Sequence, residues 1–312
     1  MERVLILLPM AIGWLLDILL GDPVRLPHPI VWLGRIISLG EHRLNKGSHR
    51  LLKGAVMSVG LIIFIFGFVW LLRRLLLMFS VPCPLLIFFD AVIIFYCLAG
   101  TTLIREVRAV FLALDRSLEE GRAQVARIVG RDTSELSAQE VRTAALETLA
   151  ENLSDGVIAP LFWLMLLGTP GMLAYKMVNT LDSMIGYRTE RYKAFGCWAA
   201  RIDDIANFIP ARLTALLMII VSGRLRLLGF VWRNGSRHAS PNSGYPEAAL
   251  AGILDCRFGG PHYYFGELFD KPYIGEHDRQ LTTVDMKTAI RINRMAEILM
   301  VLLIALCTWI CY

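Results

Sequence analysis

The sequence predicts an all-α, polytopic integral membrane protein with broken or re-entrant helices and cytoplasmic amphipathic helices. Of its 312 residues, 55% are hydrophobic and 19% are charged, whereas soluble domains average about 45–50% apolar and about 25% charged residues. The apolar residues are also clustered, because residues 54–72 and 156–175 contain no charged side chain. A run of about 18 such residues is long enough to cross a bilayer as a helix. This pattern excludes a disordered or fibrous chain and argues against a soluble enzyme.

Six apolar segments define the expected membrane helices, and we expect them to form a single membrane domain over residues 1–312. The segments are 4–20, 54–72, 85–104, 156–186, 205–222 and 295–311. The first is not followed by a small-residue cleavage site, so we expect it to be retained. Polar insertions at 101–155 and 223–294 would form a cytoplasmic active-site face. Residues 25–53 carry six Arg and Lys against the single acid Glu41, which by the positive-inside rule places them in the cytoplasm and the N-terminus outside.

Two of these segments contain helix-breaking residues. Gly168, Pro170 and Gly171 interrupt the fourth segment, and Pro210 lies in the fifth. Irregular backbone at membrane depth is tolerated where it is buried in protein or lines a cavity. We therefore expect a broken or re-entrant element that contributes to a site, and the number of crossings stays open.

The polar insertion at 101–155 contains two expected helices. Val107, Val110, Phe111, Leu114 and Leu118 recur at the spacing of one amphipathic helix. Ser-Ala-Gln-Glu at 137–140 has the pattern of a capping box, which predicts that a second helix begins there. We expect that second helix to end near residue 156.

Four acids share one face of this second helix. Glu140, Glu147, Glu151 and Asp155 lie at relative positions 0, 7, 11 and 15, and like charges so spaced repel one another. A solvated acidic face explains Glu140. Carboxylates at membrane depth are costly unless paired or metal-bound, so Glu151 and Asp155 are candidate metal ligands, with a solvated face as the alternative.

Two further polar clusters interrupt apolar segments. Lys176, Asn179 and Ser183 share a helix face beside Asp182, and either a catalytic site or an interhelical hydrogen-bond network explains them. Asp203 and Asp204 precede Asn207 by one turn. One aspartate is expected to be a helix N-cap, but the pair also has the donor chemistry that binds Mg²⁺ around phosphate oxygens.

A Gly/Asn/Ser-rich loop at 237–247 leads into an expected helix whose first residue is Pro246. The free N–H groups of a helix N-terminus bind anions, so the loop is a candidate phosphate site, and an ordinary polar turn is the alternative. Downstream, Tyr263, Tyr264 and Phe265 form either a membrane-interface belt or the wall of a large flat ligand. Near the N-terminus, Asp22 and His28 are further candidates for catalysis.

Several classes of function lack support in the sequence. It contains no P-loop, no Rossmann glycine motif, no G-x-S-x-G and no H-E-x-x-H. The net charge of +5 is scattered, which argues against a nucleic-acid partner. The six cysteines have no metal-type spacing, so we expect them to be reduced and structural.

Five motifs in order resemble those of the adenosylcobinamide-phosphate synthase family, the CobD/CbiB proteins of cobalamin biosynthesis. They are DILLGDPVRLPHP at 17–29, ENLSDGVIAPLF at 151–162, YKMVNTLDSMIGY at 175–187, DDIANFIPAR at 203–212 and SPNSGYPEAA at 240–249, followed by Gly259-Gly260-Pro261. The resemblance covers nearly the whole chain.

The resemblance implies an ATP-dependent ligase in the cytoplasmic (inner) membrane. Members of the family join adenosylcobyric acid to (R)-1-aminopropan-2-ol O-phosphate, giving adenosylcobinamide phosphate. Combined with the residue chemistry, it gives candidates for catalysis (Asp22, His28, Lys176 and Asp182), for Mg²⁺ (Glu151, Asp155, Asp182, Asp203 and Asp204) and for binding ATP and substrates (Asn152, Asn179, Arg237, His238, Ser240, Asn242, Ser243, Glu247 and Tyr263). The bilayer is the expected surrounding, and association with other late cobamide-assembly enzymes or with further copies of the chain stays open.

Two other classes of function also suit intramembrane acids. A membrane Mg²⁺-dependent phosphotransferase or prenyltransferase would carry Asp clusters, but Pro160 and Gly186 stand where those enzymes would have an Arg and an Asp. An ion-coupled transporter would have broken helices and buried carboxylates, but no inverted repeat is evident. Turnover of ATP that depends on a corrinoid acid separates the ligase from both.

Overall fold

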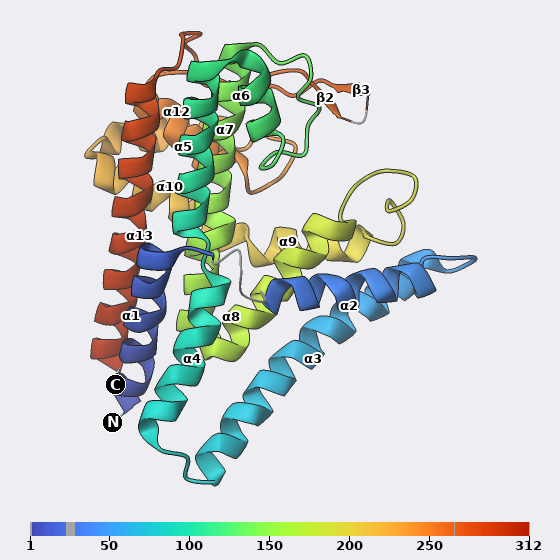
Figure 1. Ribbon diagram of the computed structural model, residues 1–312, viewed down its shortest axis with the longest axis vertical. Coiled ribbons are helices and arrows are strands. Elements are labelled where there is room, and N and C mark those ends of the chain that lie inside the picture. The colour runs from blue at the N-terminus through green and yellow to red at the C-terminus, as the bar shows by residue number, and fades with distance from the viewer. Residues whose placement is uncertain (1, 23–28, 265, 312) are drawn as a thin grey trace. The chain divides into compact units, whose positions relative to one another are not determined.

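The computed structural model describes residues 2–22, 29–264 and 266–311. Almost all regular structure in these residues is helical (Figure 1), which confirms the all-α prediction. The α-helices are α1 (Glu2–Leu20), α2 (Pro29–Leu44), α3 (Arg50–Met78), α4 (Cys83–Cys97), α5 (Gly100–Arg116), α6 (Leu118–Val125), α7 (Ala138–Leu153), α8 (Ala159–Ile185), α9 (Cys197–Ala206), α10 (Phe208–Ser222), α11 (Leu228–Gly235), α12 (Gly244–Leu254) and α13 (Thr283–Cys311).

Short irregular helices and strands complete the described residues. A π-helical turn, Ser154–Ile158, joins α7 to α8, and a 3₁₀ turn, Leu225–Leu227, precedes α11. Two antiparallel strand pairs follow α12: β1 (Phe258–Gly259) pairs with β4 (Tyr273–Ile274), and β2 (His262–Tyr264) pairs with β3 (Glu267–Phe269).

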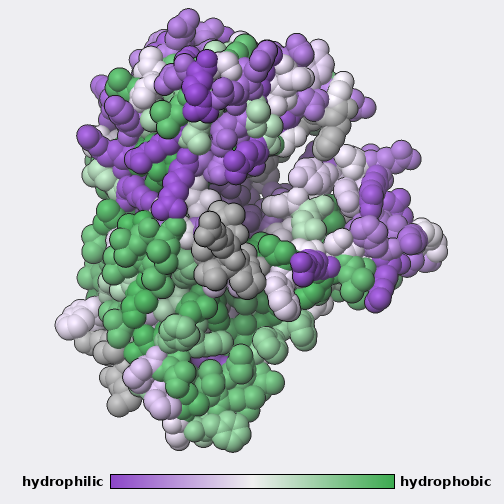
Figure 2. Space-filling view, in the orientation of Figure 1, coloured by the Kyte–Doolittle hydropathy of each residue, from purple (hydrophilic) through white to green (hydrophobic). Residues whose placement is uncertain are grey.

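Four helical stretches are long and apolar enough to cross a membrane, and a fifth span results if the bent pair α9 and α10 counts as one. The four are Arg50–Met78, Cys83–Arg116, Ala138–Ile185 and Thr283–Cys311. The apolar N-terminal helix, Ile6–Leu20, is shorter than a full span. The surface over α1, α3 and α4 in Figure 2 is almost uniformly hydrophobic, as lipid-facing helices require. The protein is therefore a multi-pass membrane protein, as the sequence predicts.

Contacts divide the chain into two compact units, each assembled from separate segments. The first unit comprises Met1–Ala99, Ala159–Asn207 and Leu303–Tyr312, and the second comprises Gly100–Ile158 and Phe208–Leu302. The single domain expected from the sequence stays a prediction.

In the first unit, α8 packs against α2, α3, α4 and α9, and α1 packs against α4. Ile37, Met177, Leu181 and Phe195 are fully buried between these helices. One buried acid, Asp90, accepts hydrogen bonds from Thr169 Oγ1 at 2.7 Å and Arg73 Nε at 3.1 Å. This pairing satisfies the carboxylate that α4 carries at membrane depth.

Close packing in the first unit depends on Gly54 of α3. A Cβ at this position would lie 1.8 Å from the backbone oxygen of Phe195, whereas a Cβ at Gly60 on the same helix would meet nothing within 4 Å. We expect Gly54→Ala to destabilise the protein by about 1–3 kcal/mol, because the backbone of residue 195 must move away. Gly60→Ala should be neutral or stabilising by up to about 1 kcal/mol. Thermal denaturation of the two variants in the same detergent checks this, and equal melting temperatures would contradict the packing.

In the second unit, α12 is the central helix. It contacts α7, α10 and α11, and its residues from Tyr245 to Ala251 are all buried. Around it, α5 contacts α6 and α7. The predicted capping box is present at the start of α7, where Ser137 and Glu140 exchange hydrogen bonds. These helices form the frame on which the candidate site is built.

Several boundaries expected from the sequence are wrong. The amphipathic helix does not run through Leu118, because Ser117 caps a new helix by accepting the N–H of Glu120 at 3.1 Å. The second helix does not end near residue 156, since the π-helical turn carries it on into α8. The helix of the phosphate loop begins at Gly244, two residues before Pro246.

Two other expectations need correction. Asp203 and Asp204 are not N-caps, because α9 begins at Cys197 and both acids lie inside it. The basic region 25–53 contains a helix, α2, that we did not expect. The break in the fourth apolar segment is confirmed at Gly168, whose φ of 69° and ψ of −165° are non-helical.

Candidate active site

The polar centre of the second unit is built on two glutamates of α7. Glu147 is only 4% exposed, and it forms an ion pair with Arg131, whose side chain is 9% exposed. Its other oxygen, Oε1, accepts the backbone N–H of Gly259 at 2.6 Å. One buried carboxylate therefore holds both the loop before α7 and the strand β1.

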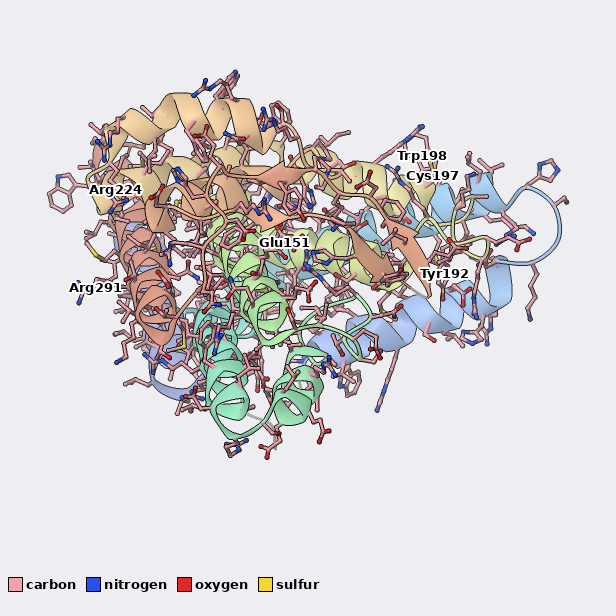
Figure 3. The ribbon with its side chains drawn as sticks, turned by 90° about the horizontal axis from the view of Figure 1, so that it is seen from above. Glu151, Tyr192, Cys197, Trp198, Arg224 and Arg291 are labelled. Carbon is pink, nitrogen blue, oxygen red and sulfur yellow. The ribbon has the colours of Figure 1, made fainter. Side chains whose placement is uncertain are left out.

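Glu151 lies one turn further along α7 and is half-buried. Its Oε1 accepts a hydrogen bond from Ser243 Oγ at 2.8 Å, which joins the acidic face of α7 to the loop before α12. In Figure 3, Glu151 lies well apart from Arg224 and Arg291, which belong to the same unit. The neighbouring Asn152 turns back to its own helix and donates to the carbonyl of Thr148 at 3.1 Å.

The loop before α12 is held by its own side chains. The Ser240 hydroxyl accepts the backbone N–H groups of Asn242 at 3.2 Å and Ser243 at 3.3 Å. The N–H of Ser240 donates to Nδ1 of His238 at 3.0 Å. Two of the N–H groups that we expected to face a phosphate are therefore used within the loop, so a phosphate there would need other donors.

Arg212 of α10 supplies such a donor beside the loop. Its guanidinium is stacked between the rings of Phe208, at 3.6 Å, and Tyr245, at 4.1 Å. It also donates to the Asn242 side chain at 3.3 Å and to the Pro241 carbonyl at 3.4 Å. A planar guanidinium fixed in this way is well suited to a phosphate group.

Glu247, in the first turn of α12, is buried and surrounded by other acids. Burial raises its pKa well above the ordinary value of a glutamate, and the negative charges of Glu147 and Glu151 raise it further. Nε2 of His238 lies 3.8 Å from Oε1 of Glu247. Burial also lowers the pKa of His238, and its Nδ1 is already a hydrogen-bond acceptor. Burial therefore favours the uncharged form of both residues.

The raised pKa of Glu247 predicts how stability changes with pH. Well below about pH 4.5 the group is protonated in both the folded and the unfolded chain. As the pH rises toward its folded-state pKa, only the unfolded chain loses the proton, so its contribution to folding stability is lost. Glu247→Gln stays neutral and should melt at a higher temperature than the wild type at pH 8, with little difference near pH 4.5. Melting curves at both pH values check this, and a variant less stable at pH 8 would contradict it.

Two further groups from the segment after α12 complete the arrangement. Lys271 acts electrostatically on His238 and Glu247, and His262 of β2 is only 6% exposed. We call the set Arg131, Glu147, Glu151, His238, Glu247, His262 and Lys271 the polar cluster. It combines three acids, two permanent cations and two histidines.

The remaining expected residues of the second unit have different surroundings. Asp155 lies in the π-helical turn. Arg237 is exposed. Tyr263 is 54% exposed, and its carbonyl accepts the N–H of Asp132 at 2.9 Å. Tyr263 is therefore available to an external surface or ligand.

The other expected site residues belong to the first unit. Lys176 is buried on α8, and Ser183 donates to the carbonyl of Asn179 at 2.8 Å. Asp182 lies in the last turns of the same helix. A hydrogen-bonded chain runs from Tyr175 Oη to Asn207 Oδ1, at 2.8 Å, and from Asn207 Nδ2 to Asp203 Oδ2, at 3.0 Å. Asp204 is the next residue of α9.

Two of the candidate residues near the N-terminus are only partly covered by the structure. Asp22 follows Gly21, whose φ is 62°, directly after α1. His28 lies outside the described residues, as does Phe265, and of Tyr264 only the backbone is described. Among the described residues, no three His, Cys, Asp or Glu side chains are grouped closely enough to hold a metal ion by themselves.

Four residues that the sequence analysis did not select as site residues proved central: Arg131, Arg212, His262 and Lys271. Arg131 lies in the loop before α7, and Arg212 lies within the apolar segment 205–222. No local spacing marks Lys271 or His262 as partners of α7. A signal was available only for Arg212, which ends one of the quoted motifs.

Comparisons with known proteins identify the family. The model of the CobD/Cbib protein family matches residues 10–293. The chain belongs to the CobD/CbiB family. It is 40% identical to the cobalamin biosynthesis protein CbiB of Salmonella arizonae, over 97% of this chain and 98% of the relative. It is 42% identical to the cobalamin biosynthesis protein CobD of Photorhabdus laumondii, over 94% and 95% of the two chains. No solved structure matches.

Membership of the CobD/CbiB family confirms the resemblance read from the motifs. The matched region, 10–293, includes every residue of the polar cluster and all of α10 and α12. The polar cluster thus lies within the part of the chain that defines the family.

Proposed function

We propose that the chain is an ATP- and Mg²⁺-dependent ligase of cobalamin biosynthesis that forms the amide between adenosylcobyric acid and (R)-1-aminopropan-2-ol O-phosphate. The product is adenosylcobinamide phosphate. Family membership supports an enzyme of this pathway. The observation that carries the chemistry is the polar cluster, in which Glu147, Glu151 and Glu247 lie among Arg131 and Lys271, with the stacked Arg212 at the same helix N-terminus.

Amide formation from a carboxylate requires activation of the acid. In the simplest route the acid's carboxylate oxygen attacks the γ-phosphorus of ATP, and ADP leaves with the electrons of the broken P–O bond. The amine nitrogen of the second substrate then attacks the acyl carbon, and phosphate leaves as the C–N bond forms. In both steps negative charge develops on phosphate oxygens. Fixed cationic donors in a site with little water therefore lower the barriers of both steps.

The carboxylates of the polar cluster suit a Mg²⁺ ion that is held jointly by the protein and by substrate phosphates. Mg²⁺ keeps several waters and is usually held by one or two carboxylates together with substrate phosphates. The negative charges of Glu147 and Glu151, which add to the effect of burial in raising the pKa of Glu247, are charges that a divalent cation would neutralise. Glu151, which is half-buried at the edge of the cluster, is the residue that would hold it. When bound, Mg²⁺ supplies charge neutralisation at the phosphates.

The chain's own cations have distinct expected roles. Arg212, fixed between two rings, would orient a phosphate at the loop before α12. Lys271, which acts on both His238 and Glu247, would stabilise the negative charge that develops on a phosphate. Arg131 is tied to Glu147 and so would position β1 rather than bind substrate.

The large amphipathic corrinoid would be bound at the membrane surface. Tyr263, Leu268 and Phe269 of the β2–β3 hairpin are each about half-exposed, and aromatic groups of this kind suit a large flat ligand or a lipid interface. Location in the inner membrane with a cytoplasmic active site belongs to the same proposal. Lys176 and Asp182 of the first unit remain candidates for catalysis, as do Asp203 and Asp204 for Mg²⁺.

Reconstitution tests this proposal. The purified protein in detergent is incubated with adenosylcobyric acid, aminopropanol phosphate, Mg²⁺ and ATP, and mass spectrometry follows the amide while each component is omitted in turn. We expect product and ADP only when all four are present. Hydrolysis of ATP without any need for the corrinoid, or no corrinoid binding by folded and monodisperse protein, would contradict the ligase and favour a phosphotransferase or transporter.

A further inference from the structure

His262 has an unusual position in the polar cluster. It is the first residue of β2, and pairing of β2 with β3 places His262 opposite Phe269. The side chain is 6% exposed, yet its Nε2 atom has no hydrogen-bond partner among the described residues. A buried polar atom without a partner costs free energy, so the position calls for a partner that is not part of the chain.

Burial and two nearby cations favour the neutral form of the His262 imidazole. Burial lowers its pKa, and the positive charges of Arg131 and Lys271 lower it further, while the acids Glu147 and Glu140 act in the opposite direction. These groups come from the loop before α7, from α7 itself and from the segment after β3. A neutral imidazole with an unpartnered ring nitrogen can accept a proton at neutral pH.

The proposed reaction needs such a group. An aliphatic amine is an ammonium at neutral pH, because its pKa is close to the value of about 10.4 for a lysine side chain. It must lose one proton before its nitrogen lone pair can attack the acyl carbon. We propose that His262 is the general base of amide formation, accepting this proton at Nε2. The inference rests on the ligase function proposed above.

Amide formation by this route needs no further reagent. The ammonium gives one proton to Nε2 of His262, and the freed nitrogen forms the C–N bond while the C–O bond to phosphate breaks. Phosphate leaves with that electron pair and takes the second proton from nitrogen. His262 then returns its proton to water.

Two nucleophiles separate this role from a structural one. Hydroxylamine is already uncharged at neutral pH, so it traps the activated acid as a hydroxamate without a base. We expect His262→Gln to reduce amide formation by about 10²-fold or more while hydroxamate formation stays at the wild-type rate. The matched control is His277→Gln, which changes an exposed histidine paired with Asp255 at 2.8 Å and should leave both reactions unchanged.

Other outcomes would overturn the inference. An equal loss of both reactions in His262→Gln would assign the residue a structural role, and no loss in either would remove it from the mechanism. Wild-type protein that forms neither product would instead reject the ligase function itself.

The pH dependence of the wild-type enzyme provides a test that needs no folded variant. Amide formation relative to hydroxamate formation should fall only when the pH drops well below about 6.5, the ordinary pKa of a histidine, because His262, whose pKa is lowered, then becomes protonated. A ratio that is constant through this range, after correction for the ionisation of the two free nucleophiles, would overturn the role.

Discussion

Glu151→Gln is expected to lower kcat by about 10³-fold with no loss of folding. The change keeps the size of the side chain and its ability to accept the hydrogen bond from Ser243, which is 2.8 Å long in the wild type. It removes the negative charge that would hold Mg²⁺ beside the phosphates of ATP. Loss of a single electrostatic contributor to a preorganised site typically costs about 10²–10³-fold, and loss of the cation adds to this. Initial rates as a function of Mg²⁺ and ATP concentration measure the effect.

The matched control for this change is Glu119→Gln in the first turn of α6. Glu119 is exposed, so its replacement removes the same charge from the same unit without touching the polar cluster. The control should retain wild-type turnover. Wild-type activity and Mg²⁺ dependence in Glu151→Gln would remove Glu151 from the site and leave Asp155, Asp182, Asp203 and Asp204 as the candidate ligands.

The features that sequence analysis predicted correctly are local ones. Uncharged runs identify the long helices because burying a polar backbone in lipid requires a helix, and the capping box of Ser137 and Glu140 needs only residues three positions apart. The acidic stripe of α7 follows from helical periodicity alone. These signals depend on neighbours in the sequence, so the fold does not need to be known.

The errors in the fold arise where one local signal competes with another. The apolar spacing that continues through Leu118 is overridden by the cap at Ser117. The helix α2 was missed because its charges, including Glu41 and Arg43, reduce its mean hydropathy, although Leu33 and Ile37 are buried on one face. Glu41 is satisfied by Arg191, at 2.9 Å, from a segment 150 residues away, and no local pattern could indicate that partner.

The candidate site also contains residues that local sequence patterns indicate and residues that only the folded chain brings together. Glu151, His238 and Ser243 could be selected because each lies in a local pattern of acids or turn residues. Lys271 and His262 could not, because they lie among the short strands that follow α12 and reach the cluster only after the chain folds back. Arg131 lies 16 residues before Glu147, in a loop whose path the sequence does not determine.

Replacing either partner of the buried Arg131–Glu147 ion pair is expected to have a large effect on stability. Arg131→Leu would leave the buried carboxylate of Glu147 without its cation, and removing one partner of a buried ion pair typically costs about 3–5 kcal/mol. Glu147→Leu would leave a buried guanidinium and also the N–H of Gly259 without its acceptor. An unsatisfied buried N–H costs a further 1–3 kcal/mol or so. Both single variants should therefore unfold well below the wild-type temperature.

The double variant decides whether this loss comes from the pair. Arg131→Leu/Glu147→Leu removes both buried charges, so we expect it to be more stable than either single variant and strongly non-additive. Arg127→Leu serves as the control, because the Arg127–Glu106 pair has a length of 3.0 Å but the arginine side chain is 63% exposed. An exposed pair contributes about 0–1 kcal/mol. If the two single changes at positions 131 and 147 added up in the double variant, the loss of stability would not come from the ion pair between Arg131 and Glu147, and the loop before α7 would need another anchor.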